Sequence, residues 1–285
     1  MFNQKLKLWH WLAIGLAIAD LAILYCVNTR PDGLAHIYFL NVGQGDSILI
    51  KTADGQHILI DGGPDNEVVK LIDSILPPWG RQLDLVILTH PHADHATGLI
   101  EVARRYQINE FAFNGLPYPT ETYNTLLNLI EARGIDINII DENDKYKFKR
   151  SVLDIIHPLN SGLDISANPN DTSVVAIFDY LDFELLLTGD IGVGIEDKLI
   201  QNGSVLDVEA LKVGHQGSRT STSQDLLSIA RPEVSIIAVG HNSYGHPHDE
   251  VVKRIKNFGS KLFRTDKSGT IEIVTDGHIY QVLTD

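Results

Sequence analysis

Apolar and polar positions after residue 33 change in short runs, which predict many strands separated by helices. Strand periodicity is found at 35–42, 46–52, 56–61, 83–89, 108–113, 135–140, 152–156, 173–179, 184–188, 207–213, 234–239 and 270–274. Helical periodicity is found at 66–76, 96–106, 120–133, 192–201, 221–230 and 249–258. Such an order allows two sheets packed face to face with helices outside. No low-complexity linker interrupts 33–285, so we predict a single α/β (α+β) domain there.

The first thirty residues have a different pattern. Leu8 to Val27 is a run of 20 mainly apolar residues. As a helix it would be about 30 Å long, enough to cross the hydrocarbon core of a bilayer. The segment 1–30 is therefore predicted to be a transmembrane anchor.

The charges around this run predict its orientation. Lys5 and Lys7 precede it, and the positive-inside rule then places the N-terminus in the cytoplasm and 33–285 outside. The expected localisation is the cell membrane, single-pass, with an extracytoplasmic domain. Two alternatives stay open: a cleaved signal peptide, which would release a secreted protein, and a buried soluble helix.

Composition excludes several classes of protein. Lys and Arg total 23 against 37 Asp and Glu, a formal net charge of −14. Such a balance excludes a histone-like grip on nucleic acid, which needs a broad positive surface. The single cysteine, Cys26, excludes an intramolecular disulfide framework and a cysteine-rich zinc site. Twelve histidines remain as the informative feature, because several of them are clustered.

The densest cluster is the segment 88–95, Leu-Thr-His-Pro-His-Ala-Asp-His, directly after a predicted buried strand. His90 and His92 are two positions apart, so both side chains can point to one face. Asp94 and His95 open the next helix and can face a second ion beside the first. Imidazoles and carboxylates are ligands that zinc-like ions prefer. The segment predicts a metal site; the alternative is a solvated turn capped by Asp94.

This motif resembles the one that defines the metallo-β-lactamase superfamily, and five other segments extend the resemblance. They read FLNVGQGDS at 39–47, IDGGP at 60–64, LTGD at 187–190, LKVGHQGS at 211–218 and YGHPH at 244–248. In this order they are similar to the C-terminal hydrolase-like domain of the competence protein ComEC family, which acts in bacterial DNA uptake. The resemblance implies an αββα sandwich of two mixed sheets, with a two-metal hydrolase site at their edge.

The resemblance also implies two divalent metal ions, zinc or manganese. The implied ligands are His90, His92, Asp94, His95, Asp190 and His246. Asp190 ends an apolar strand, where its carboxylate can bridge two ions, although it could merely cap the next helix. His246 is preferred to His248 because it matches the Tyr-Gly-His-Pro pattern; both could instead cap the helix near 249.

Other residues are expected to act around the metals. His215 and Asp94 are the candidate catalytic residues, and His215 could protonate a leaving group or hold a phosphate oxygen. A plain loop histidine is the alternative for His215. Ser218 and Lys212 are the candidate substrate-binding residues.

Two carboxylates are expected behind the ligands. Asp61 lies at a strand end and is predicted to orient a ligand histidine. Asp46 belongs to the glycine-containing segment 43–46, which is either a pocket wall or a plain tight turn.

The sequence departs from the superfamily pattern at one ligand. Most members carry another histidine, in a Gly-His-x-x-Gly turn, as a third ligand of the first metal, and no histidine stands in that pattern here. Asn170 occupies roughly that place, and asparagine binds zinc-like ions poorly. The first site is therefore expected to be weak, water-rich or filled by a harder ion such as manganese. Similarly, Gln216 stands where relatives often have a second histidine.

Three functions are compatible with these features. The first is a metal-dependent phosphodiesterase acting on single-stranded DNA or another phosphate ester. The second is a non-catalytic, metal-stabilised module of an envelope or DNA-uptake complex, with a membrane channel as partner. The third is β-lactam hydrolysis, which the detailed motifs favour least. With a net acidic chain, any binding to DNA should be weak and depend steeply on salt.

Overall fold

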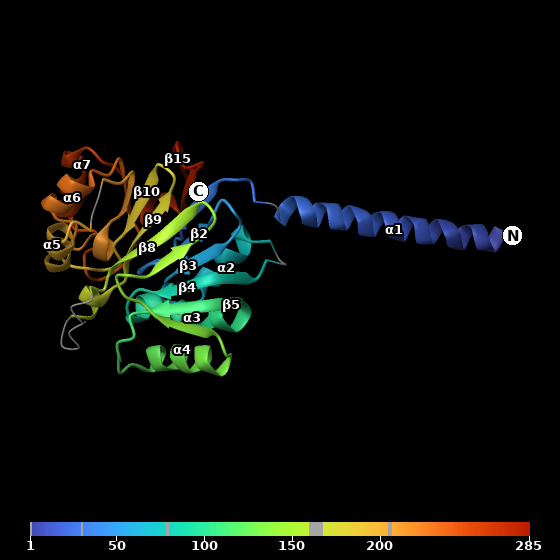
Figure 1. Cartoon of the computed structure of the whole chain (residues 1–285), viewed down its shortest axis with the longest axis horizontal. Helices are drawn as coiled ribbons and strands as arrows, with labels where there is room; N and C mark the ends of the chain where they lie inside the picture. Colours follow the sequence, from blue (N-terminus) through green and yellow to red (C-terminus); the bar gives the residue numbers. More distant parts are fainter. Residues whose placement is uncertain (1, 30, 78–79, 160–167, 205–206) are drawn as a thin grey trace.

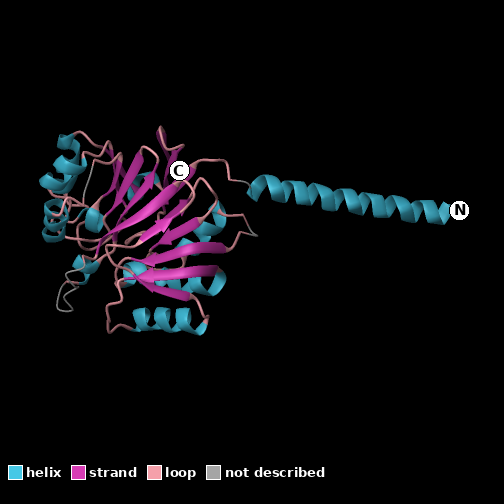
Figure 2. Cartoon of the chain, in the orientation of Figure 1, coloured by secondary structure: helices cyan, strands magenta, loops and turns pink. Residues whose placement is uncertain are grey.

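The computed structural model describes residues 2–29, 31–77, 80–159, 168–204 and 207–285. Two sheets pack face to face, and helices lie on the outside of the pair (Figures 1 and 2). Buried apolar side chains from both sheets, among them Phe39, Phe178 and Leu185, form the layer between them. The predicted sandwich of two mixed sheets is confirmed.

The first sheet has eight strands in the order β15-β14-β1-β2-β3-β4-β5-β6. Their bounds are β1 Ala35–Phe39, β2 Ile48–Lys51, β3 His57–Ile60, β4 Gln82–Leu88, β5 Gln107–Phe113, β6 Asp136–Ile139, β14 Ile271–Thr275 and β15 Tyr280–Thr284. Strands β3 to β6 run parallel to one another, and the others pair antiparallel. Parallel strands bring their carboxyl ends to one edge, where loops that carry chemistry can meet.

The second sheet has seven strands in the order β13-β12-β11-β10-β9-β8-β7. Their bounds are β7 Lys145–Lys147, β8 Ser151–His157, β9 Val175–Tyr180, β10 Phe183–Leu187, β11 Ala210–Lys212, β12 Val234–Ile237 and β13 Lys261–Arg264. Strands β10 to β13 are parallel. The second sheet therefore offers a similar edge of carboxyl ends.

Helices cover the two outer faces. The first sheet packs against α2 (Glu67–Ile75), α3 (Ala93–Arg105) and α4 (Glu121–Ala132), and the second against α5 (Val193–Gln201), α6 (Gln224–Ala230) and α7 (Asp249–Phe258). Short helical turns are η1 (Pro169–Thr172), η2 (Gly214–Gly217) and α8 (Thr265–Ser268). Each long helix buries one apolar stripe, as amphipathic periodicity requires.

The helix α1 (Phe2–Thr29) extends away from the sandwich (Figure 1). In the described part of the chain, no helix is long and apolar enough to cross a membrane. The predicted transmembrane anchor and single-pass localisation are therefore wrong.

Two ends of that predicted segment, Met1 and Arg30, lie outside the described residues. The extracytoplasmic placement of 33–285 depended on the anchor, and it is withdrawn with it.

Glycines allow the start of α3 to pack against the loops after β1 and β3. A Cβ on Gly45, whose φ is +104°, would lie 1.9 Å from the carbonyl oxygen of Asp94. A Cβ on Gly98 would lie 1.9 Å from the carbonyl oxygen of Gly62. These contacts are between backbones, so they fix the depth of α3 and of the histidines at its beginning.

Candidate metal centre

The predicted site residues follow the carboxyl ends of neighbouring strands in both sheets. Asp61 follows β3, His90 follows β4 and Asp190 follows β10. His215 lies just after β11, and His246 lies in the loop between β12 and α7. Two sheets that pack face to face thus bring side chains from distant parts of the chain to one edge.

His90 and His92 have two ring nitrogens close together. Nε2 of His90 lies 3.2 Å from Nδ1 of His92. Two ligands that each bind a tetrahedral zinc-like ion at about 2.0–2.1 Å are about 3.4 Å apart. The separation therefore fits two ligands of one ion.

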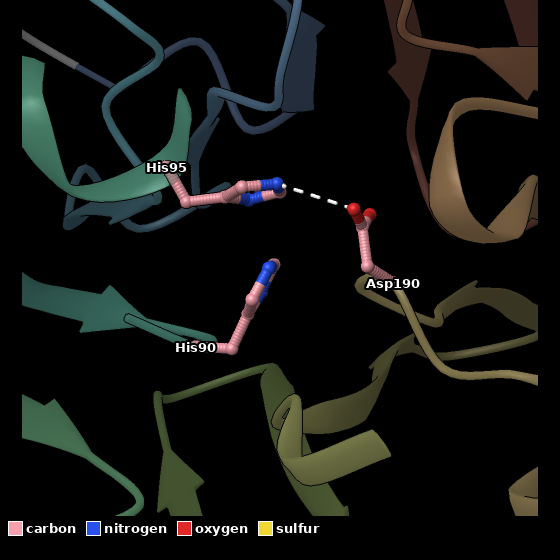
Figure 3. Close-up of side chains that lie close together, drawn as sticks. All are labelled: His90, His95 and Asp190. Carbon is pink, nitrogen blue, oxygen red and sulfur yellow. Dashed lines mark ion pairs between the residues drawn. The ribbon is translucent and has the colours of Figure 1, made fainter. Parts of the chain in front are cut away.

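His95 and Asp190 show the same relation across the two sheets. Nε2 of His95 lies 3.4 Å from Oδ2 of Asp190, and both side chains are buried (Figure 3). Ligand atoms of His90, His95 and Asp190 all lie within 4.8 Å of one another. Asp190 also lies 3.9 Å from Nε2 of His215, so its carboxylate faces groups on both sides.

Hydrogen bonds set which nitrogen of His90 carries the proton. Nδ1 of His90 lies 3.1 Å from Oγ1 of Thr89 and 3.2 Å from Oγ of Ser173. Both hydroxyls donate their protons elsewhere, Thr89 to Asp61 and Ser173 to the carbonyl of Asn170. They can therefore only accept a hydrogen bond from Nδ1–H of His90, which leaves a lone pair on Nε2 for a metal ion.

Asp61 holds the neighbouring histidine in the matching orientation. Its Oδ2 accepts a hydrogen bond from Nδ1 of His95 at 2.8 Å, and its Oδ1 accepts one from the backbone N–H of Thr89. The carboxylate is fully buried. Nε2 of His95 consequently points toward Asp190, the geometry in which a carboxylate orients a metal-binding imidazole.

Lys212 lies beneath these residues, away from solvent. Its ammonium group forms an ion pair with Asp46, lies 3.7 Å from Asp190 and donates a hydrogen bond to the carbonyl of Gly189. The side chain is 1% exposed. The prediction that Lys212 contacts substrate is therefore corrected: a buried ammonium satisfied by two carboxylates supports the site from below.

The same ammonium explains a second acidic cluster. Ligand-type atoms of Asp46, Asp61 and His95 also lie within 4.8 Å of one another. Because Lys212 already pairs with Asp46, and Asp61 already accepts from His95, this cluster is neutralised by protein groups.

The protonation states of His90 and His92 differ from that of His95. Burial lowers the pKa of His90 well below its ordinary value, and burial also lowers the pKa of His92. Burial alone would do the same to His95, but Asp190 and Asp61 outweigh it and raise the pKa of His95 well above its ordinary value. His90 and His92 are thus neutral ligands at neutral pH, whereas a metal ion on His95 must displace a proton.

The loop after β11 places His215 beside Asn170. His215 and Gln216 both have left-handed φ values, +45° and +54°, an uncommon conformation for residues with side chains. Nδ2 of Asn170 lies 3.2 Å from Nε2 of His215. Asn170 is therefore in the site, next to the candidate catalytic histidine.

His246 is positioned by Asn242. The amide of Asn242 accepts hydrogen bonds from the backbone N–H groups of Tyr244 and His246 and donates to the carbonyls of Gly240 and His246. The His246 ring packs edge-on to that of His215, with centroids 5.2 Å apart. Its Nδ1 is buried and has no hydrogen-bond partner among the described residues, as a free ligand atom requires.

Asp94 has a partner that sequence reasoning missed. Nε2 of Gln216 donates to Oδ2 of Asp94 at 3.1 Å, and that oxygen lies 3.9 Å from Nε2 of His95. Gln216 had been noted only as a departure from the His-His pattern. Ser173 carries no sequence signal of a role in the site, because His90 and Asp190, which it contacts, are distant in the sequence. Asn242 bonds only to residues within four positions of itself, and an asparagine in a loop does not by itself indicate such a role.

Ser218 remains a prediction as a substrate-binding residue. It is 6% exposed, and its hydroxyl lies 3.0 Å from that of Thr220.

The residues present fit a pair of divalent ions: the donors are imidazoles and carboxylates, and their separations are those of shared ligands.

Comparison with known families and sequences agrees with this geometry. The family model "Metallo-beta-lactamase superfamily" matches residues 40–241, more than half of the chain. "Recombination protein 2" of Haemophilus influenzae is 31% identical over 239 residues, covering 82% of this chain and 28% of that protein. "Competence protein ComA" of Neisseria gonorrhoeae is 28% identical over 272 residues, covering 90% and 36%.

"ComE operon protein 3" of Bacillus subtilis is 25% identical over 270 residues, covering 88% of this chain and 34% of that protein. The chain thus spans about a third of the length of these relatives. Among solved structures, the metallo-beta-lactamase fold protein YhfI of Bacillus subtilis has a TM-score of 0.55 at 13% identity, covering 84% of this chain and 99% of that one. Igni18, a metallo hydrolase of Ignicoccus hospitalis, has a TM-score of 0.53 at 17% identity, covering 83% and 98%. Both likenesses show the shared fold.

Proposed function

Since the chain belongs to the metallo-beta-lactamase superfamily, we propose that it is a two-metal phosphodiesterase that hydrolyses nucleic acid or a related phosphodiester. The observation that carries the proposal is the convergence of His90, His95 and Asp190, three buried ligand-type side chains, at the edge shared by the two sheets. His92, Asp94 and His246 extend this set on its open side. The cofactors proposed are two divalent ions, zinc or manganese.

Bound divalent ions supply positive charge for phosphate oxygens and acidity for an attacking water. The protein's own groups do the rest. Asp190 faces His95 on one side and His215 on the other, so it lies between the two groups of ligands. His215 is in reach of a leaving-group oxygen beside Asp190 and can donate a proton there. Asp61 and Lys212 keep the ligand side chains in place without contacting substrate.

The test uses the purified chain loaded with Mn²⁺ or Zn²⁺, assayed on single-stranded DNA and on bis(p-nitrophenyl) phosphate. We expect metal-dependent turnover of the diester, and a loss of at least about a thousandfold in Asp190→Ala. The matched control is Asp182→Ala, which removes an exposed carboxylate at the other end of β10. No turnover by metal-loaded protein, or equal turnover after Asp190→Ala, would refute the proposal.

A second candidate function is a non-catalytic module of a DNA-uptake complex, stabilised by metal and bound to a membrane channel. The length of the relatives favours it, since the competence proteins are about three times longer than this chain. The superfamily resemblance adds that a histidine ligand is expected roughly where Asn170 stands. This candidate predicts that metal removal lowers the melting temperature while no phosphodiester is turned over. Co-purification with a channel protein would support it, and turnover of the model diester that Asp190→Ala abolishes would exclude it.

A further inference from the structure

A cavity of about 400 Å³ opens beside the metal centre, on the side of the second sheet. Asp190 and His215 belong to its lining, so the cavity directly adjoins the candidate metal centre. The loop before β9 supplies Asn168, Asn170 and Asp171, and Thr220 also lines the cavity, with its carbonyl bonded to the N–H of Val193. The volume is within the range of small-molecule sites.

The chemistry of the wall excludes a second phosphate group. Among the described residues that line the cavity, none is a lysine or an arginine, whereas Asp171 and Asp190 are carboxylates. The beginning of α5 also faces the cavity, but Oδ1 of Asp171 already accepts the backbone N–H of Gly192 at 3.0 Å. The positive end of that helix is thereby compensated, and among the described lining residues only His215 could pair with another anion.

The polar groups suit hydroxyls instead. Amide, hydroxyl and carboxylate side chains can each accept from or donate to an alcohol. Asn170 is 8% exposed, and its Oδ1 has no hydrogen-bond partner in the described structure. Exchanging the two ends of this amide would leave the other end without a partner, so the conclusion does not depend on the assignment. Among the described lining residues, the only aromatic ring is that of His215, whereas sites for stacked bases use several aromatic rings.

We propose that this cavity binds a sugar ring with free hydroxyl groups, joined to the phosphate that the metal centre holds. The inference rests on the proposed function and specifies its substrate: the site favours esters of ribose or another hydroxylated sugar over those of a sugar without hydroxyls. Asp190 belongs to both the metal centre and the cavity wall, so a sugar attached to a phosphate at the metals enters the cavity directly.

The experiment measures binding, which is independent of turnover. The Mn²⁺-loaded full-length chain is titrated calorimetrically with uridine 5′-monophosphate and with 2′,3′-dideoxyuridine 5′-monophosphate, which differ only in two hydroxyls. Two hydrogen bonds of ordinary strength predict an affinity about tenfold higher for the first. Equal affinity for the two nucleotides, or no binding of either, would overturn the proposal.

Variants locate the preference in the cavity. Gly194 lines the cavity, lies in the first turn of α5 and would have nothing within 4 Å of an added Cβ, so Gly194→Phe adds a bulky ring at the cavity wall without a backbone clash. We expect this variant to abolish the tenfold preference for the nucleotide with hydroxyl groups. The matched control, Gln201→Phe, places the same side chain at the exposed last residue of α5 and should keep the preference. A preference that survives in Gly194→Phe would overturn the proposal.

A second variant keeps the proposal testable if Gly194→Phe does not fold. Thr220→Val removes a hydroxyl from the cavity wall and keeps the side-chain shape. We expect the preference to fall from about tenfold to about threefold. Turnover of bis(p-nitrophenyl) phosphate by the same sample tests the proposed function separately. Turnover without a hydroxyl preference rejects only the sugar site, whereas a hydroxyl preference without turnover rejects only the hydrolase.

Discussion

The two sheets contribute to the metal centre in different ways. The first sheet supplies one contiguous segment, His90 to His95, and a single carboxylate, Asp61, binds both its beginning at Thr89 and its end at His95. The second sheet supplies isolated side chains on separate loops, and each loop has its own polar support, such as Ser173 for the backbone of Asp190 and Asn242 for His246. One half is held at a single point, and the other half at many.

This difference predicts how many candidate ligands a single substitution disturbs. A change at the common support of the first half should disturb several ligands together. A change in the second half should affect one ligand and leave the rest in place. Three residues link the two halves and are exceptions. Lys212 pairs with Asp46 from the first sheet's side and approaches Asp190 on the second. Ser173 contacts both His90 and the backbone of Asp190, and Gln216 donates to Asp94.

The largest effect is expected for Lys212→Met, which leaves Asp46 buried without its cation. Burial alone lowers the pKa of Lys212, but Asp46 and Asp190 outweigh it and raise that pKa, so the ammonium is charged in the fold. Removing one member of a buried pair should lower the free energy of unfolding by about 3–5 kcal/mol. Urea denaturation of metal-free protein measures this loss. The double variant Lys212→Met/Asp46→Asn should recover at least half of it, and no recovery would contradict a direct pairing.

Asp61→Asn should disturb the first half as a unit. The amide can still accept from the N–H of Thr89, but its NH₂ group opposes the N–H of His95. We expect about 1–3 kcal/mol lower stability and 10- to 100-fold weaker metal binding, measured by competition with a chromophoric chelator. The control is Asp84→Asn, which changes a carboxylate within β4 that accepts from the N–H of His57. Equal effects of the two variants would contradict a special role for Asp61.

Asn242→Ala should affect the second half at one ligand alone. It removes all the side-chain hydrogen bonds that shape the loop of His246, while the rest of the sheet keeps its contacts. We expect about tenfold weaker binding of one metal ion and a change in stability of about 1 kcal/mol or less. Metal content by elemental analysis should fall from two ions toward one. Loss of both ions would contradict the prediction that this substitution affects only one ligand.

The smallest effect concerns pH. Burial lowers the pKa of His157, whose Nδ1 donates to the carbonyl of Ser173. A folded-state pKa below the unfolded value means that the unfolded chain binds more protons, so stability is present above about pH 6.5 and is lost as the pH falls through the folded pKa. His157→Asn keeps a donor and does not titrate. In urea denaturation of metal-free protein at pH 7.5 and 5.5, the variant should lose less stability than the wild type; an equal loss would contradict this assignment.

The sequence predicted the half of the site that is contiguous. His90, His92, Asp94 and His95 are neighbours in the chain, so their spacing alone places them together. Lys212 was misassigned because its burial depends on Asp46, which comes from a distant segment and meets it only when the sheets pack. The contact of Ser173 with His90 and that of Gln216 with Asp94 have no local pattern for the same reason, whereas Asn242 contacts residues within four positions of itself.

The fold was predictable where strands are buried on both faces. The strand predicted at 83–89 corresponds to β4, whose last four residues are all buried. Strands β7, β13 and β15 were not predicted, because all three lie at sheet edges and their residues are mostly exposed or half-buried, which weakens the apolar alternation. The helix predicted from 96 begins at Ala93, since Asp94 and His95 lie in its first turn.

The glycine contacts at the start of α3 have a practical consequence for genetics. Neither Gly45 nor Gly98 bears a functional group, yet each touches a backbone carbonyl so closely that one methyl group would push α3 outward. An alanine at either position would therefore disrupt the candidate metal centre in an allele that still encodes every candidate ligand. Such an allele separates the physiological need for the intact centre from the need for any one of its residues.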